Sequence, residues 1–278
     1  MRCSRRFLCA KVTELLYDGE CQLTRVKGER VGLLSLNRPA RRNSIGRTLL
    51  QELHDRIEYC SNPANEIRCL VLASSVTGVF CAGSDLKERR SMSVDESRIF
   101  VQRLRDTFNE LEDLSIPTIA AIEGKALGGG CELALCADIR VAGADAVFGL
   151  PETSLAIIPG AGGTYRVPRV MGYSRALELI LTAESINAAR ALQCGLVNEV
   201  TPAGAAVEAA LRMAQRIASN GPIAVAAAKA AVRGGYGQTR DVGMAAEARQ
   251  YDVVLQTQDR LEGLRAFAEK RPPQYEGK

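Results

Sequence analysis

Histidine is almost missing from this chain, and tryptophan is missing altogether. One histidine occurs in 278 residues, and aromatic residues make up 5% of the total. The single histidine, His54, lies among Leu49, Leu50 and Leu53 at the spacing of an amphipathic helix. This placement argues against a histidine-dependent catalytic triad and against a histidine-rich metal site. The sequence therefore predicts no metal site.

Long apolar runs and paired cysteine motifs are also missing. No apolar run approaches about 18 residues, so no membrane span and no membrane partner are expected. The nine cysteines include no C-x-x-C pair, and Cys131 and Cys136 lie inside an apolar helical pattern. We expect reduced core thiols in an intracellular protein rather than a disulfide framework.

Several nucleotide-binding signals are missing as well. The net charge of +4 is too small to indicate a nucleic-acid partner by itself. Lys125 follows Gly124, but Ala126 stands where a phosphate-binding loop needs Ser or Thr. The stretch Gly160–Gly163 follows a proline and lacks the final glycine of a dinucleotide loop, because Tyr165 stands there.

What the chain does contain is a glycine-rich stretch with two acids, over residues 124–159. Gly128, Gly129 and Gly130 precede a helical pattern at 131–137 that carries Glu132, and Glu152 follows in a second apolar setting. Free N–H groups at a helix N-terminus favour negative charge. Two carboxyl groups beside such amides suit general acid–base chemistry next to an oxyanion. The alternative is a flexible loop with two surface glutamates.

The remaining pattern predicts an α/β protein. Apolar runs predict strands, and spaced apolar residues predict helices. Strands are expected at 31–37, 69–73, 118–122, 139–142, 147–150 and 196–200, helices at 47–60 and from the capping box at 93–96 onward, and a turn-rich loop at 78–87. The repeated order of strand, strand or turn, and helix predicts units that stack to bury their faces.

The two ends of the chain differ from its middle. Residues 1–12 begin Arg-rich and free of acid, as in a mitochondrial presequence, although a disordered basic tail is the alternative. Residues 13–202 are expected to form the core. Residues 203–278 are rich in alanine and predict three or four helices, whose apolar faces require docking on the core or on a partner subunit.

Five sequence blocks, in order, resemble the enoyl-CoA hydratase/isomerase (crotonase) family from about Val31 to the C-terminus. They are Leu36-Asn-Arg-Pro39, Cys81–Glu88, Ala126–Leu133, Pro151-Glu152 and Ile158–Thr164. Within the family, the runs at 80–89 and 259–271 are most similar to the methylglutaconyl-CoA hydratase group, which includes an AU-rich-RNA-binding member. The resemblance implies a crotonase spiral of ββα units with a C-terminal helical trimerisation region, and a trimer or a hexamer.

The resemblance also implies roles for individual residues. The backbone N–H groups of Ser84 and Gly129 correspond to the family's oxyanion hole, although most members have Ala at the position of Ser84. Glu132 and Glu152 match the two carboxyl groups that hold the water. Substrate and CoA contacts are implied for Ser84, Asp85, Leu86, Lys87, Gly128, Gly129, Gly160, Tyr251 and Lys270. Acyl-CoA is then the substrate, and no cofactor is expected.

The implied activity is addition of water to the 2,3 double bond of an enoyl-CoA thioester in the mitochondrial matrix, with 3-methylglutaconyl-CoA as one candidate. An isomerase of the same fold needs only one carboxyl group, so the pair favours the hydratase. An RNA-binding homologue is the alternative from another class. The helix at 47–60 carries two arginines against three acids, 2 − 3 = −1, and no basic stripe, so a nucleic-acid partner is not expected.

Overall fold

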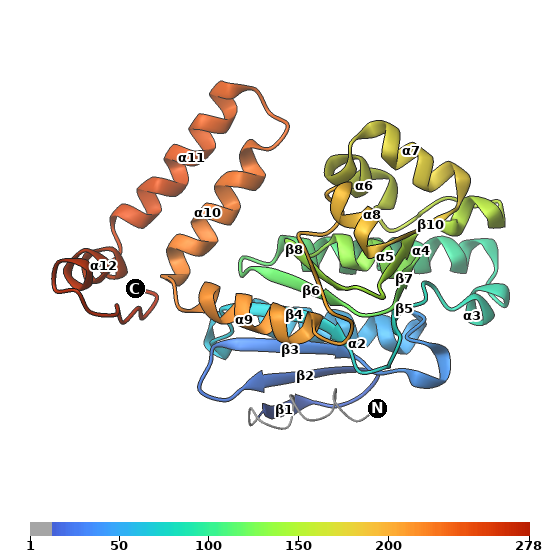
Figure 1. Cartoon of the computed structure of the whole chain (residues 1–278), viewed down its shortest axis with the longest axis horizontal. Coiled ribbons are helices and arrows are strands. Elements are labelled where there is room, and N and C mark those ends of the chain that lie inside the picture. Colours follow the sequence, from blue (N-terminus) through green and yellow to red (C-terminus); the bar gives the residue numbers. More distant parts are fainter. Residues whose placement is uncertain (1–12) are drawn as a thin grey trace.

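The computed structural model describes residues 13–278, and the predicted presequence at 1–12 lies outside that part. Two sheets form the body (Figure 1). The seven-stranded sheet has the order β1-β2-β3-β4-β6-β8-β11, and the four-stranded sheet has the order β10-β9-β7-β5. The large sheet contains β1 (Thr13–Tyr17), β2 (Cys21–Val26), β3 (Val31–Leu36), β4 (Cys69–Ser74), β6 (Thr118–Ile122), β8 (Ile139–Gly143) and β11 (Glu199–Thr201). The small sheet contains β5 (Val79–Cys81), β7 (Lys125–Leu127), β9 (Val147–Gly149) and β10 (Ser185–Asn187).

The chain alternates between the two sheets. Strands β4, β6 and β8 are parallel neighbours in the large sheet, and the strand that follows each of them, β5, β7 or β9, joins the small sheet. Helical segments then return the chain to the next unit. The elements involved are α3 (Leu86–Arg90), α4 (Val94–Asp113), α5 (Gly129–Leu135) and the 3-10 helix η3 (Pro151–Leu155). The expected spiral of ββα units is confirmed.

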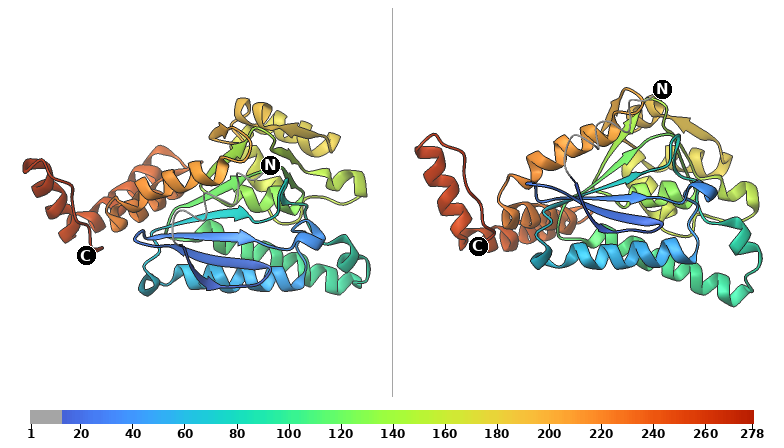
Figure 2. Two further views of the ribbon diagram at one scale, coloured as in Figure 1. Left: turned by 60° about the horizontal axis from the view of Figure 1, so that its bottom comes forward. Right: turned by 90° about the horizontal axis from the view of Figure 1, so that it is seen from below.

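Helices cover both faces of the large sheet. On one face, α2 (Arg47–Ser61) packs beside α4, and their apolar residues join alternate strand residues such as Leu34, Leu70 and Leu72 in the main core (Figure 2). On the other face, α9 (Ala206–Ala218) packs its alanines against Leu33 and Val71. The alternation of the two faces along one strand is the two-residue period of β-structure.

The C-terminal helices extend away from the sheets. After α6 (Gly163–Met171), α7 (Tyr173–Thr182), α8 (Ala188–Gln193) and α9, the chain forms α10 (Pro222–Gly235), α11 (Arg240–Leu255) and α12 (Gln258–Ala268). These last three helices project to one side of the body (Figure 1). They leave Tyr251, Leu264 and Phe267 at 63%, 59% and 86% exposure. Apolar side chains that lie so far from their own core favour a partner surface.

Most predicted elements are confirmed, and three predictions need correction. The expected strand at 196–200 is wrong in its bounds, because β11 is Glu199–Thr201. Leu196 and Val197 are buried as a strand would bury them, but they lie in the connecting segment before it. The expected loop at 78–87 contains β5 and the start of α3. The sequence prediction also missed β1 and β2, an antiparallel pair at the sheet edge.

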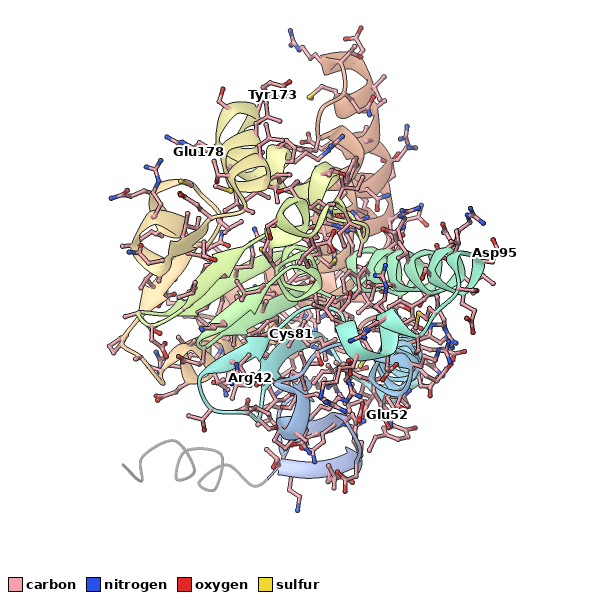
Figure 3. The ribbon with its side chains drawn as sticks, turned by 90° about the vertical axis from the view of Figure 1, so that its right-hand side faces the viewer. Arg42, Glu52, Cys81, Asp95, Tyr173 and Glu178 are labelled. Atoms are coloured by element: carbon pink, nitrogen blue, oxygen red, sulfur yellow. The ribbon has the colours of Figure 1, made fainter. Side chains whose placement is uncertain are left out.

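The cysteines in the described part of the chain are buried free thiols, as expected for Cys131 and Cys136. Figure 3 shows Cys81 inside the body, whereas Asp95 and Tyr173 lie at its periphery, at the starts of α4 and α7. Within residues 13–278, no helix is both long enough and apolar enough to cross a membrane.

Candidate active site

The candidate residues follow the carboxyl ends of three strands of the small sheet. Strands β5, β7 and β9 are parallel neighbours, and β7 lies between the other two. Their carboxyl ends, at Cys81, Leu127 and Gly149, are followed by Ser84, Gly129 and Glu152. Because parallel strands end at one edge of a sheet, these three segments converge where α/β sheets commonly bind ligands.

A large cleft opens at this edge. Its volume is about 1880 Å³, above the roughly 300–1,000 Å³ of pockets for drug-sized ligands. The predicted site residues that line it are Ser84, Leu86, Gly128, Gly129, Glu132, Glu152 and Gly160. Residues of α4, of the loop at 157–162 and of the C-terminal end of α10 complete the wall. The cleft is large enough for an elongated ligand.

Two backbone segments, at 81–83 and 127–130, approach each other closely at the N-terminus of α5. A Cβ atom on Gly130 would lie 2.2 Å from the carbonyl oxygen of Cys81, and one on Gly83 would lie 2.9 Å from that of Leu127. Only glycine permits this approach, and Gly83 has a φ of +96° as well. The packing brings Ser84 beside Gly129, because a Cβ on Gly129 would lie 3.6 Å from the Ser84 nitrogen.

The amides of Ser84 and Gly129 are available to a ligand. The Ser84 N–H has no hydrogen-bond partner among residues 13–278. Gly129 is the first residue of α5, so its N–H lies outside the hydrogen bonds of that helix. Two neighbouring free amides form a pocket suited to an oxygen that carries partial negative charge.

Glu132 is buried but well supplied with donors. Its side chain is in the first turn of α5 with 2% exposure, and its Oε1 accepts from Ala161 N at 2.9 Å and from Gly163 N at 2.7 Å. Burial raises the pKa of Glu132, and the two amides and the charges of Arg166 and Arg105 oppose that rise. Gly163 begins α6, so the carboxyl group also lies at a helix N-terminus.

Glu152 lies in a different environment in η3. Its Oε2 is buried without a hydrogen-bond partner within the described chain. Burial raises the pKa of Glu152 to about 7, its own amide opposes the rise, and the negative charge of Glu132 adds to it. A Cβ on Gly128 would lie 2.8 Å from Glu152 Oε1, so this glycine leaves room for the carboxyl group. The cleft therefore pairs a donor-rich carboxylate with a carboxyl group that keeps a proton near neutral pH.

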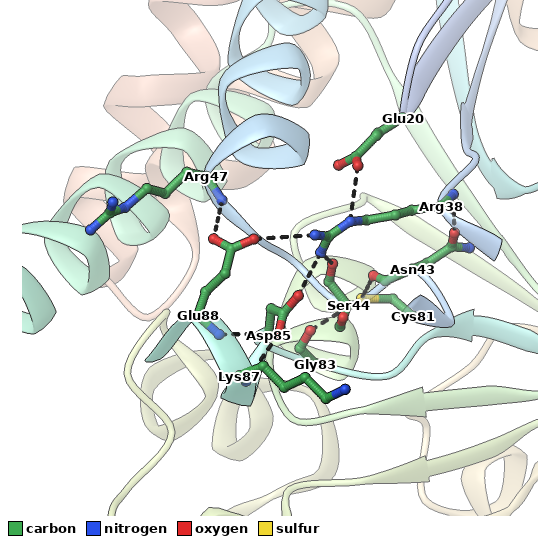
Figure 4. A network of polar contacts seen from close by, with 10 residues as sticks. All are labelled: Glu20, Arg38, Asn43, Ser44, Arg47, Cys81, Gly83, Asp85, Lys87 and Glu88. Carbon is green, nitrogen blue, oxygen red and sulfur yellow. Dashed lines mark hydrogen bonds and ion pairs between the residues drawn. The ribbon is translucent and has the colours of Figure 1, made fainter. Parts of the chain in front are cut away.

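An ion-pair network holds the segment that carries Ser84. The Arg38 guanidinium donates to Glu20 Oε1 at 3.0 Å, to Asp85 Oδ2 at 2.9 Å and to Glu88 Oε1 at 3.1 Å (Figure 4). Asp85 Oδ1 in turn caps α3 by accepting from the amides of Lys87 and Glu88. The network joins Glu20 and Arg38, near the start of the core, to the segment that directly follows Ser84.

Asn43 completes this support from inside the core. It is fully buried with a φ of +55°. Its Oδ1 accepts from Arg38 N at 2.8 Å, and its Nδ2 donates to Phe80 O at 2.9 Å and to Ser74 Oγ at 2.8 Å. Asn43 thus ties the turn after β3 to β5, the strand that leads to Ser84.

Four of the predicted CoA contacts lie off this cleft. Asp85 is 4% exposed and is occupied by Arg38 and the α3 cap. Lys87 is exposed, and its side chain leaves the network (Figure 4). Tyr251 and Lys270 are exposed on the C-terminal extension, and neither lines the cleft of its own chain. Contact between these last two and this cleft would require a second subunit.

Sequence reasoning missed the residues that support the site. Arg38 appeared only inside a resemblance block, and Asn43, Arg105 and Arg166 were not singled out. Arg38 and its partner Asp85 are 47 residues apart in the sequence, and Arg166 and its partner Glu112 are 54 residues apart. Asn43 offered one local signal, because Asn adopts a positive φ more readily than most residues. Tyr165 also lines the cleft, and the Arg169 guanidinium carbon lies over its ring, 3.5 Å from the ring centroid.

Comparisons with known proteins agree with this fold. The family described as Enoyl-CoA hydratase/isomerase matches residues 27–278. A protein of Arabidopsis thaliana named "Probable enoyl-CoA hydratase 2, mitochondrial" is 50% identical over 92% of this chain and 85% of its own length. The human "Methylglutaconyl-CoA hydratase, mitochondrial" is 42% identical over 95% of this chain and 80% of its own length. The crystal structure of an enoyl-CoA hydratase from Bacillus anthracis has a TM-score of 0.90 and 45% identity, covering 94% of this chain and all of that one.

The chain therefore belongs to the enoyl-CoA hydratase/isomerase family, the crotonases. It is an enzyme, and its activity is that of an enoyl-CoA hydratase, as the sequence predicted.

Replacing Asn43 with Ala tests the support of the Ser84 loop. The change removes the acceptor of the Arg38 amide and a buried donor to the Phe80 carbonyl, and it puts Ala at a positive φ. We expect a loss of about 2–4 kcal/mol in the free energy of unfolding. Thermal melting measures it, with Asn43→Gly as the control that removes the same hydrogen bonds without the backbone strain. Melting of Asn43→Ala within one degree of wild type would contradict this role for Asn43.

Proposed function

We propose that this cleft adds water across the 2,3 double bond of an enoyl-CoA thioester, with each candidate residue in a distinct role. The amides of Ser84 and Gly129 hold the thioester oxygen. Glu132 orients the water and takes its proton, and Glu152 delivers a proton to the α-carbon. The observation that carries the proposal is the placement of two free amides beside two desolvated carboxyl groups in one cleft.

The reaction follows from the movement of charge. The water oxygen bonds to the β-carbon as Glu132 accepts its proton, and the electrons of the double bond move onto the thioester oxygen. Each amide directed at that oxygen lowers the barrier by roughly 3–4 kcal/mol when it strengthens in the transition state. The proton held by Glu152 then passes to the α-carbon. One proton enters the pair and one leaves it, so the net charge of the pair is unchanged.

The proposal also specifies the acyl group of the substrate. We propose a short enoyl-CoA, with 3-methylglutaconyl-CoA as the branched candidate. Similarity to the human methylglutaconyl-CoA hydratase supports the branched candidate, and similarity to the plant enoyl-CoA hydratase supports the simpler one. Parallel assays of crotonyl-CoA and 3-methylglutaconyl-CoA separate the two. Acyl-CoA enters as substrate, and the proposed reaction uses no further cofactor.

We also propose that the enzyme acts as a trimer or hexamer in the mitochondrial matrix. The exposed apolar residues of α11 and α12 support assembly. The word "mitochondrial" in the names of the plant and human relatives supports the location. In such an assembly, Tyr251 and Lys270 contact the CoA in a neighbouring subunit's cleft, which accounts for their distance from their own.

Exchange of the acids for their amides separates hydratase from isomerase. Glu132→Gln and Glu152→Gln keep the side-chain shape but remove proton exchange, so each should lower kcat for hydration by on the order of 10²–10⁴ with a much smaller change in KM. The double variant should lose less than the product of the two losses. Steady-state hydration measures this, with 3-enoyl-CoA isomerisation in parallel.

Glu110→Gln is the matched control, because Glu110 is exposed on α4 and bonds His54 outside the cleft. It should keep wild-type rates. Full hydratase activity in either cleft variant would contradict the two-carboxyl mechanism. Loss of isomerisation from only one of the two would instead indicate an isomerase.

The pKa of Glu152 predicts the pH dependence of the reaction. Because that pKa is raised to about 7, Glu152 holds its proton below pH 7 and loses it above. The kcat/KM for hydration should therefore fall above about pH 7, since this parameter reports the free enzyme. Hydration releases no net proton, so its equilibrium constant does not depend on pH. The kcat/KM for dehydration of the product should therefore fall over the same pH range. Rates that stay level from pH 6 to 9 in wild type would exclude Glu152 as the acid.

Assembly is tested in solution with the full chain. Light scattering should give a trimer or hexamer at micromolar concentration, because Leu261, Leu264 and Phe267 on α12 are exposed among the described residues of one subunit. Phe267→Glu places a charge in the proposed contact and should shift the population toward smaller species. A stable, active monomer of the wild-type chain would refute the proposed assembly.

A further inference from the structure

Arg105 is one of the cleft-wall arginines that form no ion pair with an acid among residues 13–278; Arg89 and Arg169 are the others. Arg105, on α4, donates from Nε and Nη2 to the carbonyl oxygen of Gly160 at 3.2 and 3.0 Å. Its Nη1 donates to Gln102 Oε1 at 3.1 Å. No carboxylate within residues 13–278 forms an ion pair with it, whereas Arg166 and Arg233 of the same cleft pair with Glu112 and Asp113.

The acceptor of Arg105 is part of the support of Glu132. The Gly160 carbonyl and the Ala161 N–H belong to one planar peptide unit. That N–H donates to Glu132 Oε1 at 2.9 Å. One side of the peptide thus faces a guanidinium and the other faces a carboxylate. A carbonyl that accepts two charge-assisted bonds makes its amide a stronger donor, because linked hydrogen bonds polarise one another.

We propose that Arg105 is a positioning residue for hydration, which acts through the Gly160–Ala161 peptide to fix the Glu132 carboxylate and to favour its charged form. The proposal rests on the role of Glu132 in the proposed function. Arg105 fixes the peptide plane and, through it, the direction of one of the two amides that Glu132 accepts. Its charge also stabilises the carboxylate from a distance.

The other charges around Glu132 do not replace this contribution. Arg166 of α6 donates from Nη1 to the next carbonyl, Ala161 O, at 2.8 Å, but its remaining donors serve Glu112 and Asn109. Glu152 of η3 adds no cation, and its ionised form and that of Glu132 repel each other. Burial raises the pKa of the Cys131 thiol on α5 and of the Cys136 thiol directly after it, so both stay neutral. Of the two arginines whose charges act on Glu132, Arg105 is therefore the one without an ion pair in the described part of the chain.

Three variants of the full chain test the proposal with crotonyl-CoA. Arg105→Gln removes the charge and should lower kcat for hydration on the order of 10-fold, with KM changed less than about 2-fold. The low-pH limb of kcat/KM should move upward by roughly 0.5–1 pH unit, because Glu132 then protonates more readily. Arg105→Lys keeps the charge, so most of the wild-type kcat and most of the wild-type position of the low-pH limb should be recovered. Arg103→Gln removes the same charge from an exposed position of α4 and should match wild type.

An infrared measurement provides a readout without turnover. Subtracting the spectrum of Glu132→Gln from that of wild type isolates the Glu132 carboxyl band across pH. The same subtraction with Arg105→Gln in both proteins should show Glu132 protonating at higher pH. An unshifted band, or an Arg105→Gln pH profile equal to that of Arg103→Gln, would overturn the proposal.

Two other outcomes would also count against it. A rise in KM at constant kcat would make Arg105 a substrate contact rather than a positioning residue. A lysine variant as slow as the glutamine variant would show that charge is not what Arg105 contributes. Full activity of Glu132→Gln would instead refute the proposed function itself, which separates that failure from failure of the Arg105 proposal.

Discussion

The site depends on the close approach of two backbone segments, the exit of β5 and the N-terminus of α5. Gly83 and Gly130 make the approach possible, because a Cβ on either would contact a carbonyl oxygen of the other segment at under 3 Å. The approach places the free amides of Ser84 and Gly129 side by side. Behind the Ser84 loop, the Arg38 network and buried Asn43 fix its position from the core. Precise amide placement matters because a preorganised donor costs no reorganisation during the reaction.

The second requirement is that two carboxyl groups in one desolvated cleft behave differently. Glu132 receives two backbone N–H groups and the field of two arginines, whereas the Oε2 of Glu152 receives no hydrogen bond from the described chain. Hydrogen bonds to the charged form favour ionisation, and burial without them favours the neutral acid. The loop after Pro159 therefore contributes to the chemistry through its amides, although its side chains are small. The division into base and acid comes from the neighbourhood of each group rather than from its residue type.

The local parts of this arrangement are predictable from sequence, and the long-range parts are not. The strand at 118–122, the capping box of α4 and the glycine-preceded helix with Glu132 follow from short patterns, and so does the alternation of strand and helix. Strand β1 was missed because it is a mostly exposed edge strand without a clear apolar alternation. Strand β2 was missed although its buried Cys21 and Leu23 alternate with the polar Gln22 and Thr24, which is a strand pattern. The links of Arg38 to Asp85 and of Arg105 to Gly160 span 47 and 55 residues, so only the folded chain brings these groups together. The spacing of Asp85 and Glu88 is a local capping signal, but the pairing of Asp85 with Arg38 could not be recognised before its surroundings were known.

A crystal structure of the enzyme with butyryl-CoA tests the central claim most directly. This saturated thioester has no double bond to hydrate, so it should stay intact in the cleft. We expect its thioester oxygen about 2.7–3.1 Å from both the Ser84 and the Gly129 nitrogen, with the α-carbon facing Glu152. A water held by Glu132 should lie near the β-carbon. A thioester oxygen bound away from these two amides, or an α-carbon directed away from both carboxyl groups, would contradict the account.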